Sequence, residues 1–129
     1  NRKIYLANDI KLAINLNLSG AYVPSFNKEL AIRRYSFKKN FTLLGSAHNI
    51  FEIKTKENQG IEVLFLSPLF ITKNYKQELG IFKFNTLSKF YKKKIIALGG
   101  INERNIRSLK NTNAYGFSGI TYFKNKFKK

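Results

Sequence analysis

The chain has 129 residues, of which 43% are hydrophobic and 15% aromatic, so it is long enough and apolar enough to bury the core of one domain. Its net charge of +17 suits phosphorylated ligands or nucleic acid, but the lysines are spread along the chain, whereas a nucleic-acid module usually concentrates them. The lack of cysteine excludes a disulfide framework, and no apolar run reaches the ~20 residues of a membrane span. We therefore expect a cytoplasmic protein with no membrane partner.

Short apolar runs alternate with longer polar stretches along the whole chain. The short runs predict strands covered on both faces, at Ile4–Ala7, Ala21–Val23, Phe41–Leu44, Val63–Leu66, Ile95–Leu98 and Phe117–Tyr122. The stretches between them predict helices, at Ile10–Leu18, Lys28–Tyr35, Asn49–Asn58, Phe82–Tyr91 and Asn102–Leu109. Asn49 and Asn102 are candidate N-caps for two of these helices.

Strands and helices that alternate at this spacing predict right-handed βαβ units and a parallel sheet. Two α/β architectures remain open, a doubly wound sheet and a (β/α)8 barrel. Polar or small residues lie at the ends of all six predicted strands. Ligand groups at the end of every strand favour the barrel, because an open sheet gathers them at one switch point.

The predicted strand at Ile95–Leu98 ends in Gly99 and Gly100, directly before a predicted helix. Glycines let the backbone approach an anion closely, and a helix N-terminus offers free N–H groups to it. A simple tight turn is the alternative interpretation. The next predicted strand supports a phosphate site, because the loops after the last two strands of such barrels often hold phosphate.

Several motifs carry a family resemblance. In chain order they are Asn8-Asp9, Leu12-Ala13, Gly20, Ser46-Ala47-His48-Asn49, Glu52, Gly60, Ser67-Pro68-Leu69-Phe70-Ile71-Thr72, Gly80, Ala97-Leu98-Gly99-Gly100-Ile101, Asn105 and Gly116. This ordered set resembles the thiamine phosphate synthases and the TenI-type thiazole tautomerases, and it covers nearly the whole chain. Their pattern includes a Ser-x-His-Ser-like element, then a helix, then a Gly-Pro-x-Phe/Tyr-x-Thr strand end.

The resemblance implies an N-terminally truncated (β/α)8 TIM barrel that contains strands three to eight. Residues 1–129 would form a single domain that lacks the first two βα units and, with them, the family's Gln/Arg/Lys cluster for the pyrimidine diphosphate. The unpaired sheet edges of such a chain predict self-association, and thus a homo-oligomer.

The implied activity is that of a transferase. It would couple hydroxymethylpyrimidine diphosphate with thiazole phosphate and release thiamine phosphate and pyrophosphate. A TenI-like tautomerase and a non-catalytic paralogue that binds a phosphorylated ligand are the alternatives. A basic nucleic-acid-binding protein is the alternative from another class.

The same resemblance implies roles for individual residues. His48 and Ser46 match catalytic positions, and Asp9 matches a ligand of Mg²⁺. Asn27 stands where the family has a second carboxylate, and neither Lys73 nor Lys76 matches the position of its diphosphate-binding lysine. The implied substrate-binding residues are Asn8, Ser67, Thr72, Asn74, Gly99, Gly100, Ile120 and Thr121. Ordinary structural roles are the alternatives: helix capping for Asp9, packing for His48 and turn formation for the hydroxyl groups.

Overall fold

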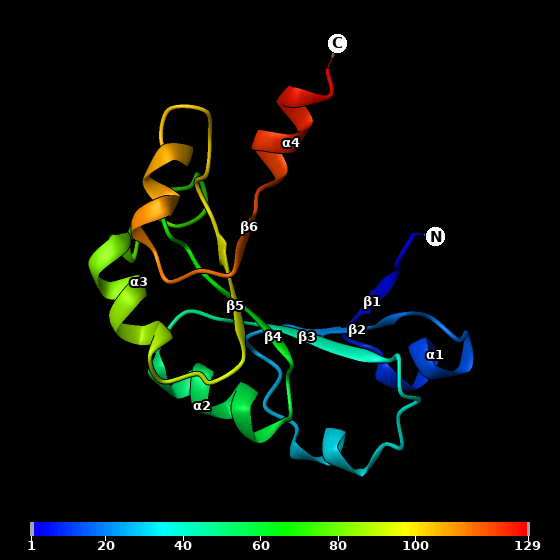
Figure 1. Ribbon diagram of the computed structural model, residues 1–129. Coiled ribbons are helices and arrows are strands. Elements are labelled where there is room, and N and C mark those ends of the chain that lie inside the picture. The colour runs from blue at the N-terminus through cyan, green and yellow to red at the C-terminus, as the bar shows by residue number, and fades with distance from the viewer. Residues whose placement is uncertain (1, 129) are drawn as a thin grey trace. The chain divides into compact units, whose positions relative to one another are not determined.

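The computed structural model describes residues 2–128, which form an α/β fold (Figure 1). The strands are β1 (Tyr5–Ala7), β2 (Gly20–Val23), β3 (Thr42–Ala47), β4 (Val63–Leu66), β5 (Lys94–Leu98) and β6 (Gly116–Ser118). The α-helices are α1 (Ile10–Asn15), α2 (Ile50–Asn58), α3 (Gly80–Ser88) and α4 (Ile120–Lys126). Two short 3-10 helices complete the fold, η1 (Leu30–Arg34) and η2 (Ile106–Asn111).

The six strands belong to one sheet and hydrogen-bond in the order β1-β2-β3-β4-β5-β6. The pairs β1–β2, β2–β3 and β5–β6 are parallel. This order follows the sequence, as consecutive βα units predict, and it contains no reversal of the kind that forms the switch point of a doubly wound sheet. The predicted parallel α/β sheet is therefore confirmed.

The chain divides into two compact units, Asn1–Leu64 and Phe65–Lys129. In the first unit, α1 packs against β1 and β2, and α2 packs against β3. Its buried core consists of Ile10, Ala13, Ala21, Val23, Ile32, Phe41, Leu43 and Ile61.

The second unit buries apolar side chains from its strands, from α3 and from the loops between them. These are Leu66, Leu69, Phe84, Leu87, Tyr91, Ile95, Ala97 and Ile101. Among the described residues, no helix combines the length and the apolar character that are needed to cross a membrane.

The strand predicted at Phe117–Tyr122 is wrong in its second half, because β6 ends at Ser118 and α4 begins at Ile120. Aromatic residues at helical spacing explain the difference. The ring of Phe123 stacks on that of Phe127 one turn later, with centroids 6.5 Å apart, and on that of Phe117 at 5.6 Å. A helix places residues i and i+4 on the same face, which a strand does not.

The helix predicted at Asn102–Leu109 is also wrong at its start, because the chain makes a turn there and η2 begins only at Ile106. The side-chain oxygen of Asn102 accepts hydrogen bonds from the backbone N–H groups of Arg104 and Asn105, at 2.9 and 3.2 Å. Such local bonds compete with helical ones. The helix N-terminus expected directly after Gly100 is therefore not formed.

Candidate functional site

In the first unit, Asn8 and Asn27 link the loops that follow β1 and β2. Asn8 has a left-handed backbone, with φ of 56°, and its N–H donates to the carbonyl of Tyr22 at 2.7 Å. The side-chain Nδ2 of Asn27 donates to Oδ1 of Asn8 at 2.8 Å. Two of the positions singled out in the sequence are therefore in direct contact at the carboxyl ends of neighbouring strands.

Asp9 is the N-cap of α1, which is the ordinary structural role that the sequence also allowed. Its Oδ1 accepts the N–H of Leu12 at 2.9 Å. The side chain is exposed, and its Oδ2 makes no hydrogen bond to any described residue. Within residues 2–128 no three His, Cys, Asp or Glu side chains gather into a metal-binding group. Asp9 thus offers one uncommitted carboxylate oxygen at this strand end.

Lys56 on α2 is fully buried and supports the loop that carries Asn27. Its Nζ donates to the carbonyl of Asn27 at 2.8 Å and to Oε1 of Gln59 at 2.8 Å. The Nε2 of Gln59 donates in turn to the carbonyls of Asn27 and Glu29, at 2.9 and 3.1 Å. Two side chains of the α2 region therefore satisfy the backbone of the loop after β2.

Burial also changes the chemistry of Lys56. Desolvation lowers the pKa of its ammonium group to about 8, and the nearby carboxylate of Glu52 opposes part of this shift. Gly45 in β3 makes room for the side chain, because a Cβ at that position would lie 3.1 Å from Cδ of Lys56. Sequence reasoning missed this residue. The available signal was its position three residues after Ile53, on the face of α2 that is buried.

Ser46 and His48 lie at the carboxyl end of β3. The strand runs to Ala47, three residues beyond its predicted end, so Ser46 is a buried strand residue. His48 follows the strand directly and is half-buried. Its backbone N–H donates to Oε2 of Glu52 at 2.6 Å, and Oδ1 of Asn49 accepts the N–H of Glu52 at 3.0 Å. These reciprocal bonds resemble a capping box and fix the backbone of His48 at the start of α2. The predicted cap at Asn49 is confirmed.

In the second unit, the glycine loop after β5 packs directly on the loop after β4. Gly99 and Gly100 have φ of 101° and 68°, in the left-handed region. A Cβ on Gly99 would lie 2.8 Å from Cα of Pro68, and one on Gly100 would lie 2.5 Å from the carbonyl oxygen of Ile71. The N–H of Phe70 also donates to the carbonyl of Gly99 at 3.1 Å. Only glycine fits this close approach.

The loop after β6 joins the same cluster. A Cβ on Gly119 would lie 3.7 Å from Cβ of Ile101, in ordinary contact. Ile120 and Thr121 follow as the first, exposed residues of α4. The Nδ2 of Asn105 donates to the carbonyl of Gly100 at 2.7 Å and holds the glycine loop in place. Three strand ends therefore meet in this unit.

The predicted hydroxyl groups of this unit differ in their surroundings. Ser67 is buried directly after β4. Thr72 forms a turn with Tyr75, whose N–H donates to Oγ1 of Thr72 at 3.0 Å. Asn74 lies exposed inside that turn. Ser67 therefore adjoins the glycine loop through Pro68. The hydroxyl of Thr72 instead stabilises a turn, which is the structural role that the sequence also allowed.

The chain is similar to one family of known proteins over most of its length. A family model described as thiamine monophosphate synthase matches residues 2–123. The thiamine-phosphate synthase of Methanococcus maripaludis (strain DSM 14266) is 34% identical over 120 residues, which are 91% of this chain and 56% of that protein. The thiamine-phosphate synthase of Prochlorococcus marinus (strain AS9601) is 29% identical over 110 residues, which are 83% of this chain and 31% of that protein.

A solved structure shows the same fold. Thiamine phosphate pyrophosphorylase from Pyrococcus furiosus matches with a TM-score of 0.72 at 18% identity, over 92% of this chain and 56% of that chain. The chain spans from 31% to 61% of the length of the curated relatives it matches.

Proposed function

Because the chain belongs to the thiamine monophosphate synthase family, we propose that it takes part in thiamine biosynthesis as a transferase that couples hydroxymethylpyrimidine diphosphate with thiazole phosphate. In this reaction the thiazole nitrogen bonds to the methylene carbon of the pyrimidine, while the bond from that carbon to the diphosphate oxygen breaks and pyrophosphate leaves. The observation that carries the proposal is the glycine loop at Gly99 and Gly100, packed against two other strand ends.

We also propose that the six strands are part of a (β/α)8 barrel. The unbroken strand order supports this architecture, since consecutive βα units that never reverse can close on themselves. In a barrel, all carboxyl ends of the strands open toward one site.

In this proposal the second unit binds the phosphate of the thiazole. The close packing of Gly99 and Gly100 on the loop after β4 fixes the backbone that would meet the anion, and Asn105 holds the loop in that shape. Ser67 supplies a hydroxyl beside this loop, and Ile120 and Thr121 follow Gly119, which contacts Ile101. The first unit supplies the groups for the pyrimidine diphosphate, with Asn8 and Asp9 at the end of β1 and Ser46 and His48 at the end of β3.

Mg²⁺ stays a prediction, with Asp9 as the residue that would hold it. Mg²⁺ in proteins commonly binds one or two carboxylates together with substrate phosphates. The uncommitted Oδ2 of Asp9 can serve as such a carboxylate ligand. The neutral amide of Asn27 is a poorer ligand than a carboxylate. When bound, the ion would offset the negative charge that develops on the departing diphosphate.

Replacing Asn27 by aspartate tests this assignment. We expect the Asn27→Asp variant to reach half-maximal release of pyrophosphate at an Mg²⁺ concentration about tenfold lower, because a second carboxylate strengthens binding of a hard cation. Calorimetric titration with Mg²⁺ alone gives a readout that does not depend on turnover. The matched control is Asn58→Asp on α2, which adds the same charge at an exposed position. Equal shifts in both variants would contradict a site at Asp9.

A thiazole tautomerase is the second candidate, and the contact between Asn8 and Asn27 favours it. Asn27, one member of this amide pair, stands where the family has a second carboxylate. A tautomerase needs the phosphate-binding half and a proton carrier, and His48 at the end of β3 has the chemistry for proton transfer near neutral pH.

Variants of His48 test the tautomerase candidate. For a tautomerase, His48→Ala should lower turnover of thiazole phosphate at least ~100-fold, which is the low end for general acid–base catalysis. Binding of thiazole phosphate should change little, because the glycine loop is intact. His48→Gln serves as the variant that keeps most of the side-chain volume. Unchanged turnover in both variants would remove His48 from the mechanism.

A further inference from the structure

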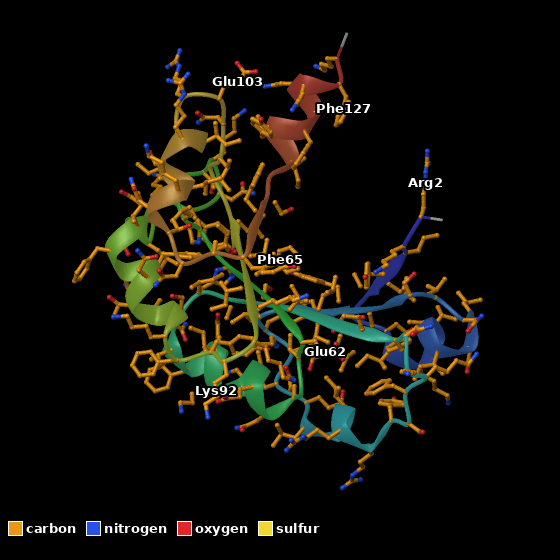
Figure 2. The ribbon with its side chains drawn as sticks, in the orientation of Figure 1. Arg2, Glu62, Phe65, Lys92, Glu103 and Phe127 are labelled. Atoms are coloured by element: carbon orange, nitrogen blue, oxygen red, sulfur yellow. The ribbon has the colours of Figure 1, made fainter. Side chains whose placement is uncertain are left out.

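The second unit contains a hollow at the opposite end of β5 from the glycine loop. It lies where α3 ends and β5 begins, and its volume is about 480 Å³. Figure 2 labels Lys92 in this connecting segment. The residues that line the hollow are Ser88, Lys89, Tyr91, Lys92, Lys93, Lys94, Ile95, Asn113 and Tyr115.

The lining of this hollow is strongly basic. It contains four lysines and no acidic residue, and all four lysines are exposed. Like charges that share one concave surface add up to a positive potential that attracts anions. A single phosphate would neutralise only part of this charge, so a ligand with several phosphate groups suits the hollow best.

Fixed polar and aromatic groups complete its wall. Oγ of Ser88 donates to the carbonyl of Asn85 at 2.7 Å, and the N–H of Asn113 donates to Oδ1 of Asn85 at 2.8 Å. The bond from Asn113 holds α3 against the segment before β6. Tyr115 is 71% exposed, and Nζ of Lys94 lies 4.7 Å from the centroid of its ring. An exposed tyrosine ring can stack on an aromatic base.

A second basic hollow, in the first unit, is the natural comparison. It is larger, about 830 Å³, and is lined by Lys3, Lys38 and Lys39 among other residues. One of its cations is already engaged, because Nζ of Lys38 donates to Oδ1 of Asn17 at 2.7 Å. Its aromatic residue, Phe41, is buried. It holds three lysines where the first hollow holds four, and it offers no stacking surface.

We propose that the hollow between α3 and β5 binds an oligophosphate, either inorganic tripolyphosphate or the triphosphate group of a nucleotide. Its volume falls within the ~300–1,000 Å³ of small-molecule sites. This site is separate from the glycine loop and is not part of the proposed synthesis of thiamine phosphate. Its ligand would reach the protein at the amino end of β5.

Charge removal tests the site. The variant K92Q/K93Q/K94Q should bind inorganic tripolyphosphate and ATP at least ~10-fold more weakly at low ionic strength, measured by calorimetry. The matched control, K3Q/K38Q/K39Q, removes the same charge from the other hollow and should change affinity less than about twofold. Equal weakening in both variants, or no binding of either ligand by the unaltered protein, would overturn the proposal.

Two further measurements complete the test. Tyr115→Leu separates the two sources of phosphate: weaker binding of ATP alone identifies a nucleotide, and unchanged binding of both ligands identifies inorganic oligophosphate. Unaltered binding of thiazole phosphate in K92Q/K93Q/K94Q would show that the fold is intact and that the two sites are independent.

Discussion

Replacing Gly100 by alanine should lower the free energy of unfolding by at least ~3 kcal/mol and abolish binding of thiazole phosphate. Two effects add. The residue has a left-handed backbone, with φ of 68°, which a side chain disfavours. In addition, the new Cβ would lie 2.5 Å from the carbonyl oxygen of Ile71 and 2.7 Å from that of Phe70. Both neighbours are backbone atoms, so the two loops would have to separate.

Gly80→Ala is the matched control for this prediction. Gly80 lies in the same unit and has a similar φ of 70°, but, apart from the nearby backbone of its own helix and its chain neighbours, no described atom lies within 4 Å of its new methyl group. We expect a loss of about 1 kcal/mol from conformation alone. Denaturant unfolding of the variants measures both values, and calorimetry measures the affinity for thiazole phosphate. Equal losses in both variants would show that the contact with Ile71 costs nothing.

The stability of the protein should depend on pH through Lys56. The pKa of this lysine falls from 10.5 in the unfolded chain to about 8 in the folded protein, so between these values the unfolded state binds more protons. The contribution of Lys56 to stability is therefore fully present above pH 10.5 and is lost as the pH falls through 8. The difference in free energy of unfolding between the unaltered protein and Lys56→Met should rise by up to ~3 kcal/mol from pH 8 to pH 10.5.

Lys54→Met is the control for this measurement, because Lys54 is exposed on the same helix. Taking the difference between variants removes the titration of all other lysines and tyrosines. Urea unfolding at several pH values from 7.5 to about 10.5 covers the window in which Lys56 titrates. If the difference for Lys56→Met stays constant across this window, the lysine is not desolvated in the folded protein.

The sequence predicts the sequential strand order, because the apolar runs define the strands and the polar residues at their ends favour a barrel over a doubly wound sheet. Local competition explains where it fails. The amide of Asn102 binds its own backbone neighbours and delays the helix, and the aromatic spacing at Phe123 and Phe127 outweighs strand propensity. Both effects depend on side-chain geometry that a pattern of apolar and polar residues does not contain.

The sequence also predicts only part of the candidate site. Gly99 and Gly100 stand out in the sequence because they directly follow a predicted buried strand, although a tight turn explains the same pair. Lys56 is not, because a lysine is normally assigned to a solvated face. Its burial depends on the space above Gly45 and on carbonyl groups that lie about thirty residues earlier in the chain.

The bonds from Lys56 and Gln59 to the loop after β2 also determine how that loop moves. The carbonyls of Asn27 and Glu29 are held by side chains of the α2 region. Loosening the last turn of α2 therefore frees the loop, and displacing the loop takes away one of the two acceptors of the buried Lys56 amine. The helix end and the loop should open together as one cooperative unit in native-state hydrogen exchange. The position of Asn27 therefore depends on the final turn of α2, a helix that contributes no group to the reaction itself.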